Sequence, residues 1–333
     1  MKKNNNAGYS AVGERVGGVE TIRLADSARE MQVMVAPSIG NMAYTFTVSG
    51  KNILWFPFSG PDTLQAQPAL CGIPFLAPWA NRIDGDEYWI NGRKYLLNAA
   101  LGNLRRDAHQ KPIHGLLNFS SAWSLVAMGA DERSAYTTSR LEFSKHPELM
   151  AQFPFAHSIT MTHRLEDGTL AVETSLENHA GEPMPVAVGF HPYFQLHDTP
   201  RDGWRVHLAA RDHLPLDEYL IPTGAHDPVA FADPHPLRVR QLDDVFTGLI
   251  RDADGLARFW VQGKQEKITV EYGPKYGVAV VYAPEGKGFI CFEPMAAVTN
   301  AFNLAHAGRC GELQIVPPDG EWRETFRIIP TGF

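Results

Sequence analysis

The chain has 333 residues, of which 44% are hydrophobic and 20% charged, enough to bury a large core without disulfides or metals. No segment approaches the roughly 18 to 20 consecutive apolar residues that span a bilayer, so the sequence excludes a membrane protein. The net charge is −7, and no lysine-rich or arginine-rich block is present. Nucleic acid and acidic membrane surfaces are therefore not expected as partners.

The N-terminus carries two lysines with no apolar segment behind them, so no secretory signal is expected. The three cysteines, Cys71, Cys291 and Cys310, are too few and too far apart for a disulfide framework or a CxxC metal site. We expect a cytoplasmic protein in which residues 1–8 form a flexible N-terminus and residues 9–333 form a single domain. Length alone would also allow two domains.

Short segments with a period of two recur along the chain and predict β-strands. In residues 169–178, for example, Leu170 and Val172 fall on one face and Ala171 and Glu173 on the other. Similar strands are predicted at 31–36, 53–58, 157–165, 204–210, 267–272, 277–283, 288–293, 312–316 and 325–330.

One turn signal, one helix signal and one proline-rich stretch interrupt this pattern. Asn91-Gly92 predicts a hairpin within 88–97, because both residues tolerate the positive φ of a type I′ turn. Ser144 could cap a short helix that Pro154 would stop. The loosest stretch is 212–240, with five prolines.

Many short strands separated by turn residues predict an all-β protein, an antiparallel sandwich or barrel with few short helices. No internal repeat of fixed period is visible, which argues against a propeller.

Two segments in the first half of the chain carry candidate polar residues. Trp79, Asn81 and Arg82 follow one another closely, and an arginine there can offer a planar fork of donors to a polar ligand. A structural salt bridge is the alternative for this arginine. His114 precedes Gly115, where the backbone can turn sharply or allow a ligand close. A packed histidine is the alternative there.

Two further segments lie in the second half. Ala187, Gly189 and His191 would share one face of a strand, so the small residues would leave open space beside the histidine. Glu293 ends an apolar strand, where a carboxylate in a partly buried place can have a raised pKa and serve as a general base. Asp243 is expected to lie in a solvated loop.

The sequence lacks GxGxxG after a strand, a P-loop, a GxSxG elbow and HExxH, and its histidines have no tight metal spacing. What remains is a metal-free acid–base site built from arginine, histidine and glutamate, with aromatic residues nearby.

Together these segments resemble the aldose 1-epimerase (galactose mutarotase-like) family. The matching motifs run in the family's order and are N-R-I with its hairpin at 81–95, H-G at 114–115, H-P-Y-F at 191–194, the aspartate segment at 243, and F-E-P followed by T-N-A-F-N at 292–303. The resemblance covers roughly residues 70 to 305. It implies a large antiparallel β-supersandwich.

The resemblance also implies an isomerase that interconverts the α and β anomers of a free aldohexose such as glucose or galactose. Glu293 would be the general base for the anomeric hydroxyl, and His191 the general acid for the ring oxygen. His114 would support the charge that develops at that oxygen. Arg82, Asp243, Asn81 and Trp79 would bind the sugar.

No cofactor or metal is implied, and the expected partner is a small-molecule sugar bound by a monomer or homodimer. The sequence departs from the family pattern at Gln195, where many members have asparagine, and after Gly115, where many have a second glycine.

Two other functions stay open. A hexose-6-phosphate 1-epimerase would need more cationic contacts than one arginine, and Arg105 and Arg106 are conceivable suppliers. A carbohydrate-binding sandwich without turnover would not need both His191 and Glu293. A third idea, a glycoside hydrolase, is not favoured, because it would need a second carboxylate and Asp243 is only a possible partner for Glu293.

Overall fold

Antiparallel β-strands make up most of the protein, which confirms the predicted all-β class. The computed structural model describes residues 8–239, 241–311 and 313–333. Most of the predicted flexible N-terminus, residues 1–7, therefore lies outside the described residues. The carbonyl of Gly8 accepts a hydrogen bond from the amide of Ser27 at 2.6 Å.

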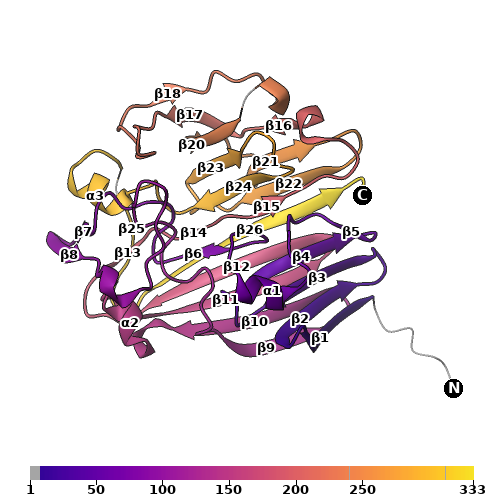
Figure 1. The fold of residues 1–333 in the computed structure, drawn as a ribbon, viewed down its shortest axis with the longest axis horizontal. Coiled ribbons are helices and arrows are strands. Elements are labelled where there is room, and N and C mark those ends of the chain that lie inside the picture. Colours follow the sequence, from indigo (N-terminus) through magenta and orange to yellow (C-terminus); the bar gives the residue numbers. More distant parts are fainter. Residues whose placement is uncertain (1–7, 240, 312) are drawn as a thin grey trace.

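Two large sheets form the body of the fold (Figure 1). The nine-stranded sheet runs in the order β19 (His235–Pro236), β16 (Arg205–His207), β21 (Ala257–Gln262), β22 (Lys267–Tyr272), β26 (Glu321–Thr331), β12 (Thr169–Asn178), β11 (His157–Glu166), β10 (Ser134–Glu142) and β9 (Ser124–Ala130). The eight-stranded sheet runs in the order β18 (Asp227–Pro228), β17 (Ala210–Leu214), β20 (Leu242–Leu249), β23 (Val278–Ala283), β24 (Ile290–Met295), β14 (Gly189–Phe190) and β6 (Phe75–Leu76), with β15 (Tyr193–Phe194) also paired to β24.

Smaller elements surround these sheets. A five-stranded sheet holds β1 (Tyr9–Val16), β2 (Val19–Asp26), β3 (Met31–Ala36), β4 (Met42–Val48) and β5 (Lys51–Asn52), in that order. Two strand pairs are β7 (Glu87–Ile90) with β8 (Arg93–Leu96), and β13 (Met184–Val186) with β25 (Gln314–Val316). The helices of the described chain are α1 (Pro61–Ala66), α2 (Pro147–Met150) and α3 (Ala301–His306), with 3₁₀ turns at Ala99–Leu101, Phe143–Lys145, Arg201–Gly203 and Leu237–Val239. None of these helices is long and apolar enough to cross a membrane.

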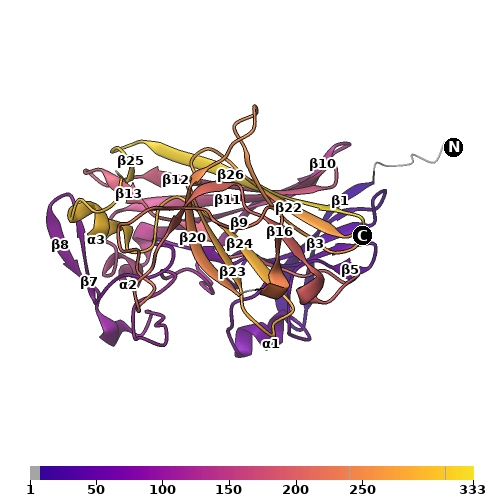
Figure 2. The same cartoon turned by 90° about the horizontal axis from the view of Figure 1, so that it is seen from above.

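The core lies between the two large sheets, and aromatic pairs connect them. Phe190 on β14 packs against Phe326 on β26 with ring centroids 4.7 Å apart. Phe292 on β24 lies 6.2 Å from Phe259 on β21. The turned view shows β11, β12 and β26 as one layer and β20, β23 and β24 as another (Figure 2). The opposite face of β24 is therefore free to build a site.

The period-two pattern predicted several strands at their observed positions. β3, β12 and β22 coincide with the predicted segments 31–36, 169–178 and 267–272. On β12, Leu170 and Val172 are buried while Ala171 and Glu173 are partly exposed, as the alternation predicts. The predicted hairpin is also confirmed, since Asn91 and Gly92 have φ of 52° and 73°.

Two local predictions were wrong. Residues 53–58 form no strand: only Leu54 makes an isolated bridge, to Phe194, and Pro57 has no N–H to donate to a ladder. The short helix near 146–153 exists as α2, but Ser144 lies within the preceding 3₁₀ turn. His146 is the N-cap residue and makes no side-chain capping bond.

The proline-rich stretch 212–240 lies at the edges of both large sheets. It contributes the edge strand β18 to the eight-stranded sheet and the edge strand β19 to the nine-stranded one. Proline suits such places, because an edge strand can lack a backbone donor on its open side.

Candidate active site

Glu293 lies on the face of β24 that points away from the core between the sheets. Its neighbour Phe292 packs into that core, so the strand alternation turns Cys291, Glu293 and Met295 to the other face. Glu293 is only 1% exposed. A carboxylate buried to this degree is costly unless a partner or a ligand compensates it.

His191 is placed against Glu293 by the break between β14 and β15. Its amide donates to the carbonyl of Pro74 at 3.0 Å, and Pro192 ends the pairing. His191 Nε2 lies 3.3 Å from Glu293 Oε1. The ring of Tyr193 stacks on the imidazole at 4.6 Å between centroids, with its hydroxyl 3.5 Å from Nε2.

The open space predicted beside His191 is absent at Gly189. A Cβ atom at Gly189 would lie 2.8 Å from Met295 Cγ and 3.2 Å from the Cβ of Ala80. The prediction was wrong because two other segments pack onto this glycine. Glycine is needed there for close packing of β14 on β24.

His114 completes a group of three buried titratable side chains. Its ring stands edge-on to that of His191, with centroids 5.4 Å apart and an interplanar angle of 79°. Its backbone has a φ of 64°, and its amide donates to the carbonyl of Asn81 at 2.9 Å. Gly115 follows because a Cβ there would lie 2.1 Å from the carbonyl oxygen of Ala77. We call Glu293, His191 and His114 the acid–base cluster.

Each member of the acid–base cluster has a buried polar atom without a hydrogen-bond partner among the described residues. These atoms are Nδ1 of His114, Nδ1 of His191 and Oε2 of Glu293. Buried polar groups in native proteins are nearly always satisfied, so each exception needs an explanation. A polar ligand that bonds to these atoms would supply one.

Burial sets the protonation of the acid–base cluster. The pKa of His191 is lowered to about 3, mainly by burial and also by the charges of Arg105 and Arg82, while a backbone hydrogen bond opposes them. Burial also lowers the pKa of His114, with added effects from His191, Arg105 and Arg82. Burial raises the pKa of Glu293 well above its usual value, the Asp243 carboxylate adds to this, and Arg82 opposes it. Burial therefore favours the neutral form of all three side chains, with the proton on Glu293 rather than on His191.

Arg82 and Asp107 form an ion pair beside the cluster. Arg82 Nε lies 2.6 Å from Asp107 Oδ2, and both side chains are largely buried. Burial alone would raise the pKa of Asp107, but hydrogen bonds from Arg82 and from the Lys111 amide lower it below its usual value. This is the salt bridge that the sequence left open as an alternative. Arg82 still acts on the electrostatics of Glu293, His191 and His114.

Asp243 lies on strand β20, so the expectation of a solvated loop was wrong for its backbone. Neighbouring residues of a strand face opposite ways, and here Asp243 is exposed while Asp244 is buried. Asp244 Oδ1 lies 2.8 Å from His213 Nε2. Desolvation raises the pKa of Asp243, Arg82 lowers it and the Asp244 charge raises it. The Asp243 carboxylate also raises the pKa of Glu293, so Asp243 lies near the acid–base cluster.

The other two predicted sugar-binding residues are buried. Asn81 is 6% exposed, and its amide nitrogen lies 3.5 Å from the sulfur of Met295. Trp79 is 2% exposed in the main hydrophobic cluster, with Tyr88 at 6.5 Å between ring centroids. The structure thus places Asn81 next to the backbone of His114 and Trp79 in the core.

Arg105 is a cation near the cluster that differs from its neighbours. Arg82, Arg106 and Lys111 are each paired with a carboxylate, from Asp107, Asp86 and Asp84 respectively. Arg105 is exposed and makes no ion pair or side-chain hydrogen bond with the described residues. Its carbonyl accepts the Ile113 amide at 2.9 Å, which fixes its backbone next to the segment of His114.

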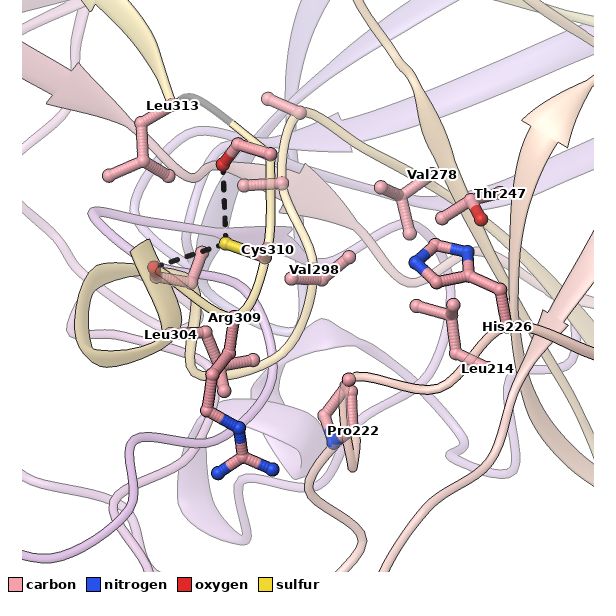
Figure 3. A pocket seen from close by; sticks show the side chains of 15 residues that line it. Leu214, Pro222, His226, Thr247, Val278, Val298, Leu304, Arg309, Cys310 and Leu313 are labelled. Carbon is pink, nitrogen blue, oxygen red and sulfur yellow. Dashed lines mark hydrogen bonds between the residues drawn. The ribbon is translucent and has the colours of Figure 1, made fainter. Parts of the chain in front are cut away.

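A separate cavity of about 200 Å³ opens farther along the same strands (Figure 3). Its lining is mostly aliphatic and includes Leu214, Val278, Val298, Leu304 and Leu313. Thr247, four residues beyond Asp243 on β20, also lines it. Val245, Val280 and Met295 belong to the same buried hydrophobic cluster as Leu214 and Val278 of the cavity lining. Among the described residues, no group of three or more His, Cys, Asp or Glu is arranged to hold a metal ion.

Comparisons with known proteins agree with this architecture. The family model described as aldose 1-epimerase matches residues 27–328. The uncharacterized protein YphB of Escherichia coli (strain K12) is 25% identical over 232 residues, which cover 66% of this chain and 71% of that protein.

Solved structures show the same fold. A galactose mutarotase-like protein from Clostridium acetobutylicum superimposes with a TM-score of 0.86 at 19% identity, over 98% of this chain and 99% of that one. Galactose 1-epimerase from Lactobacillus acidophilus NCFM gives a TM-score of 0.72 at 15% identity, with the same coverage of 98% and 99%.

Proposed function

Because the chain belongs to the aldose 1-epimerase family, we propose that it interconverts the α and β anomers of a free aldohexose such as glucose or galactose. The observation that carries this proposal is the acid–base cluster, in which three buried titratable groups each have an unpartnered polar atom. A sugar offers hydroxyl donors and acceptors that match these atoms without a change in net charge.

The proposed reaction moves two protons. Glu293 takes the proton of the anomeric hydroxyl, the C1–O1 bond becomes a carbonyl, the C1–O5 bond breaks, and His191 gives a proton to O5. Rotation about C1–C2 turns the aldehyde. Closure then returns one proton to His191 and the other to O1. His114, neutral because burial lowers its pKa, donates or accepts a hydrogen bond near O5. Each positioned proton transfer contributes roughly 10² to 10⁴-fold in rate.

The His191–Glu293 pair carries one proton in both stages of this cycle. With the open sugar the proton is on Glu293 and His191 is neutral, which is also the distribution that burial favours. With the closed sugar the pair is ionised, and the anomeric hydroxyl and O5 hydrogen-bond to the two charges. Hydrogen bonds to a charged group are stronger than neutral ones, so the sugar offsets part of the cost of the buried ion pair.

Replacing the base tests this proposal. We expect Glu293→Gln to lower the rate of anomer exchange by about 10² to 10⁴-fold while sugar binding persists, because the amide keeps the shape but cannot accept the proton. Polarimetry of freshly dissolved α-D-glucose and α-D-galactose gives the rate, and calorimetry gives the affinity. Glu285→Gln, at an exposed glutamate, is the control. Equal rates in Glu293→Gln and the parent would overturn the assignment.

A second candidate function is the 1-epimerisation of a hexose 6-phosphate, and Arg105 favours it. A phosphate requires cationic donors, and Arg105 is the unpaired one beside the acid–base cluster. If the substrate is phosphorylated, Arg105→Gln should lower kcat/KM for glucose 6-phosphate at least about tenfold and leave free glucose unchanged. Arg106→Gln, at an arginine already paired with Asp86, is the matched control. A preference for free glucose that Arg105→Gln does not change would exclude this candidate.

A further inference from the structure

Four aromatic side chains gather beside His191, and we call them the aromatic cluster: Trp55, Tyr193, Tyr282 and Phe289. Phe289 is central, with ring centroids at 4.7 Å from Trp55, 5.0 Å from Tyr193 and 6.0 Å from Tyr282. The four residues come from the segment after β5, from β15, from β23 and from the residue before β24. Strands distant in sequence therefore build one apolar wall.

The wall is not buried uniformly. Tyr193 and Phe289 are each only 5% exposed and form its buried part. Trp55 and Tyr282 are partly exposed, so part of each ring meets solvent. A partly exposed aromatic ring beside buried polar groups has the character of a ligand-contacting surface.

Tyr282 is the member that strand register places directly opposite Asp243. In the antiparallel ladders it is opposite Asp243 on β20 and opposite Cys291 on β24. Side chains opposite one another share a face, so Tyr282 lies on the face that carries Asp243 and Glu293. Its ring also meets that of His191 edge-on, with centroids 6.0 Å apart at 83°.

The hydroxyl of Tyr282 is available to a ligand. It makes no hydrogen bond with any described residue. Desolvation raises its pKa above the usual value, and the carboxylate of Asp243, the thiol of Cys291 and Glu293 add to this. The phenol therefore stays protonated at neutral pH and can donate a hydrogen bond.

We propose that Tyr282 is a substrate-binding residue whose ring supports the C–H face of an aldopyranose while its hydroxyl donates to a sugar hydroxyl. The proposal rests on the proposed function, since it places the sugar over the acid–base cluster. An aldopyranose has polar edges and apolar C–H faces. Asp243 and Glu293 meet the edge, and the partly exposed aromatic ring meets a face.

The test separates binding from turnover. Tyr282→Leu keeps an apolar side chain and removes the ring, and Tyr282→Phe removes only the hydroxyl. We expect Tyr282→Leu to raise both KM and the calorimetric Kd for the sugar about tenfold, with kcat changed less than about threefold. Tyr282→Phe should weaken binding by a smaller factor. Tyr136→Leu, at a partly exposed tyrosine on β10 in the other sheet, is the matched control.

Two outcomes would overturn the proposal: an unchanged Kd in Tyr282→Leu, or a fall in kcat with KM unaltered. Circular dichroism and thermal melting of each variant check that the fold is kept. The calorimetric Kd can be measured whether or not the protein catalyses anomer exchange. If the wild type binds aldoses but does not exchange anomers, the proposed function fails while loss of affinity in Tyr282→Leu still supports this inference.

Discussion

At the scale of single residues, the His191–Glu293 pair decides how activity depends on pH. The pair works with one proton, so it fails when it gains a second proton or loses the first. Burial lowers the pKa of His191 to about 3, so the pair gains its second proton only at a pH well below the ordinary pKa of histidine. Burial also raises the pKa of Glu293, so this residue loses its proton at a higher pH than an ordinary glutamate. Both directions widen the range in which one proton is held.

We therefore expect kcat/KM for anomer exchange to show no inflection near pH 6.5, where an ordinary histidine titrates. Polarimetry with subtraction of the buffer rate at each pH gives the profile, because free acid and base also catalyse the exchange. A sigmoid centred near 6.5, the ordinary pKa of histidine, would contradict this account of the pair.

The residue types of the candidate site could be predicted, but their surroundings could not. Glycine and histidine motifs are local signals, so His191, His114 and Glu293 stand out in the sequence, and the structure brings them together. The filled space over Gly189 depends on Met295 and Ala80, which are distant in sequence. Tyr282 had no local signal, because its relation to Asp243 exists only through strand register.

At the scale of elements, strand β11 carries two buried histidines that link stability to pH. Both ring nitrogens of His163 are without a partner among the described residues, and burial lowers its pKa to about 4. Burial lowers the pKa of His157 to about 4 as well. The unfolded chain takes up these protons below about 6.5, and the folded protein only near 4. Stability should therefore fall as pH drops through this window and level off below it.

His163→Leu tests this linkage. Between pH 7 and pH 4, each of these buried histidines should lower the free energy of unfolding of the wild type by roughly 3 kcal/mol. The decrease should be smaller by roughly 3 kcal/mol in the variant, because it lacks one of them. Urea denaturation at both pH values measures it. His109→Leu, at an exposed histidine, is the control. Identical pH dependence in His163→Leu and the parent would show that His163 is not responsible.

The elements differ in how well the sequence reveals them. β3, β12 and β22 were predicted with their observed bounds: the alternation is clear in β12, and β3 is a mostly buried apolar segment. The six-residue helices α1 and α3 are too short to complete a recognisable helical period. The 53–58 segment looks like a strand from its composition, but its pairing partners in space admit only one bridge at Leu54.

At the scale of the whole molecule, the contact between Phe190 and Phe326 joins the sheet of the candidate site to its support. Phe190 precedes His191 directly, and Phe326 sits on β26 in the middle of the nine-stranded sheet. Phe326 is fully buried. Loss of this ring would leave a cavity beneath the acid–base cluster.

We expect Phe326→Ala to lower the free energy of unfolding by about 3 to 5 kcal/mol, as measured by urea denaturation. Leu125→Ala, at a leucine on the edge strand β9 that is 46% exposed, should change it by no more than about 0.5 kcal/mol. A similarly small effect for Phe326→Ala would mean that the two sheets do not depend on this contact.

The strand order of the whole molecule could not be read from the sequence. Period-two alternation shows that a segment has one buried face, but not which strand lies beside it. β26 pairs with β12 and β22, and so joins two parts of the chain about 100 residues apart. The all-β class followed from local pattern. The more specific prediction of a supersandwich came from the resemblance to a family, which rests on motifs along the chain.

The most direct measurement is NMR exchange spectroscopy of the α and β anomeric protons of glucose and galactose at equilibrium, with and without the wild-type protein. The account predicts exchange cross-peaks that grow faster with protein than in buffer, scale with protein concentration and are accompanied by no new product. Exchange at the buffer rate for both sugars and for glucose 6-phosphate would contradict catalysis of anomer exchange by the acid–base cluster.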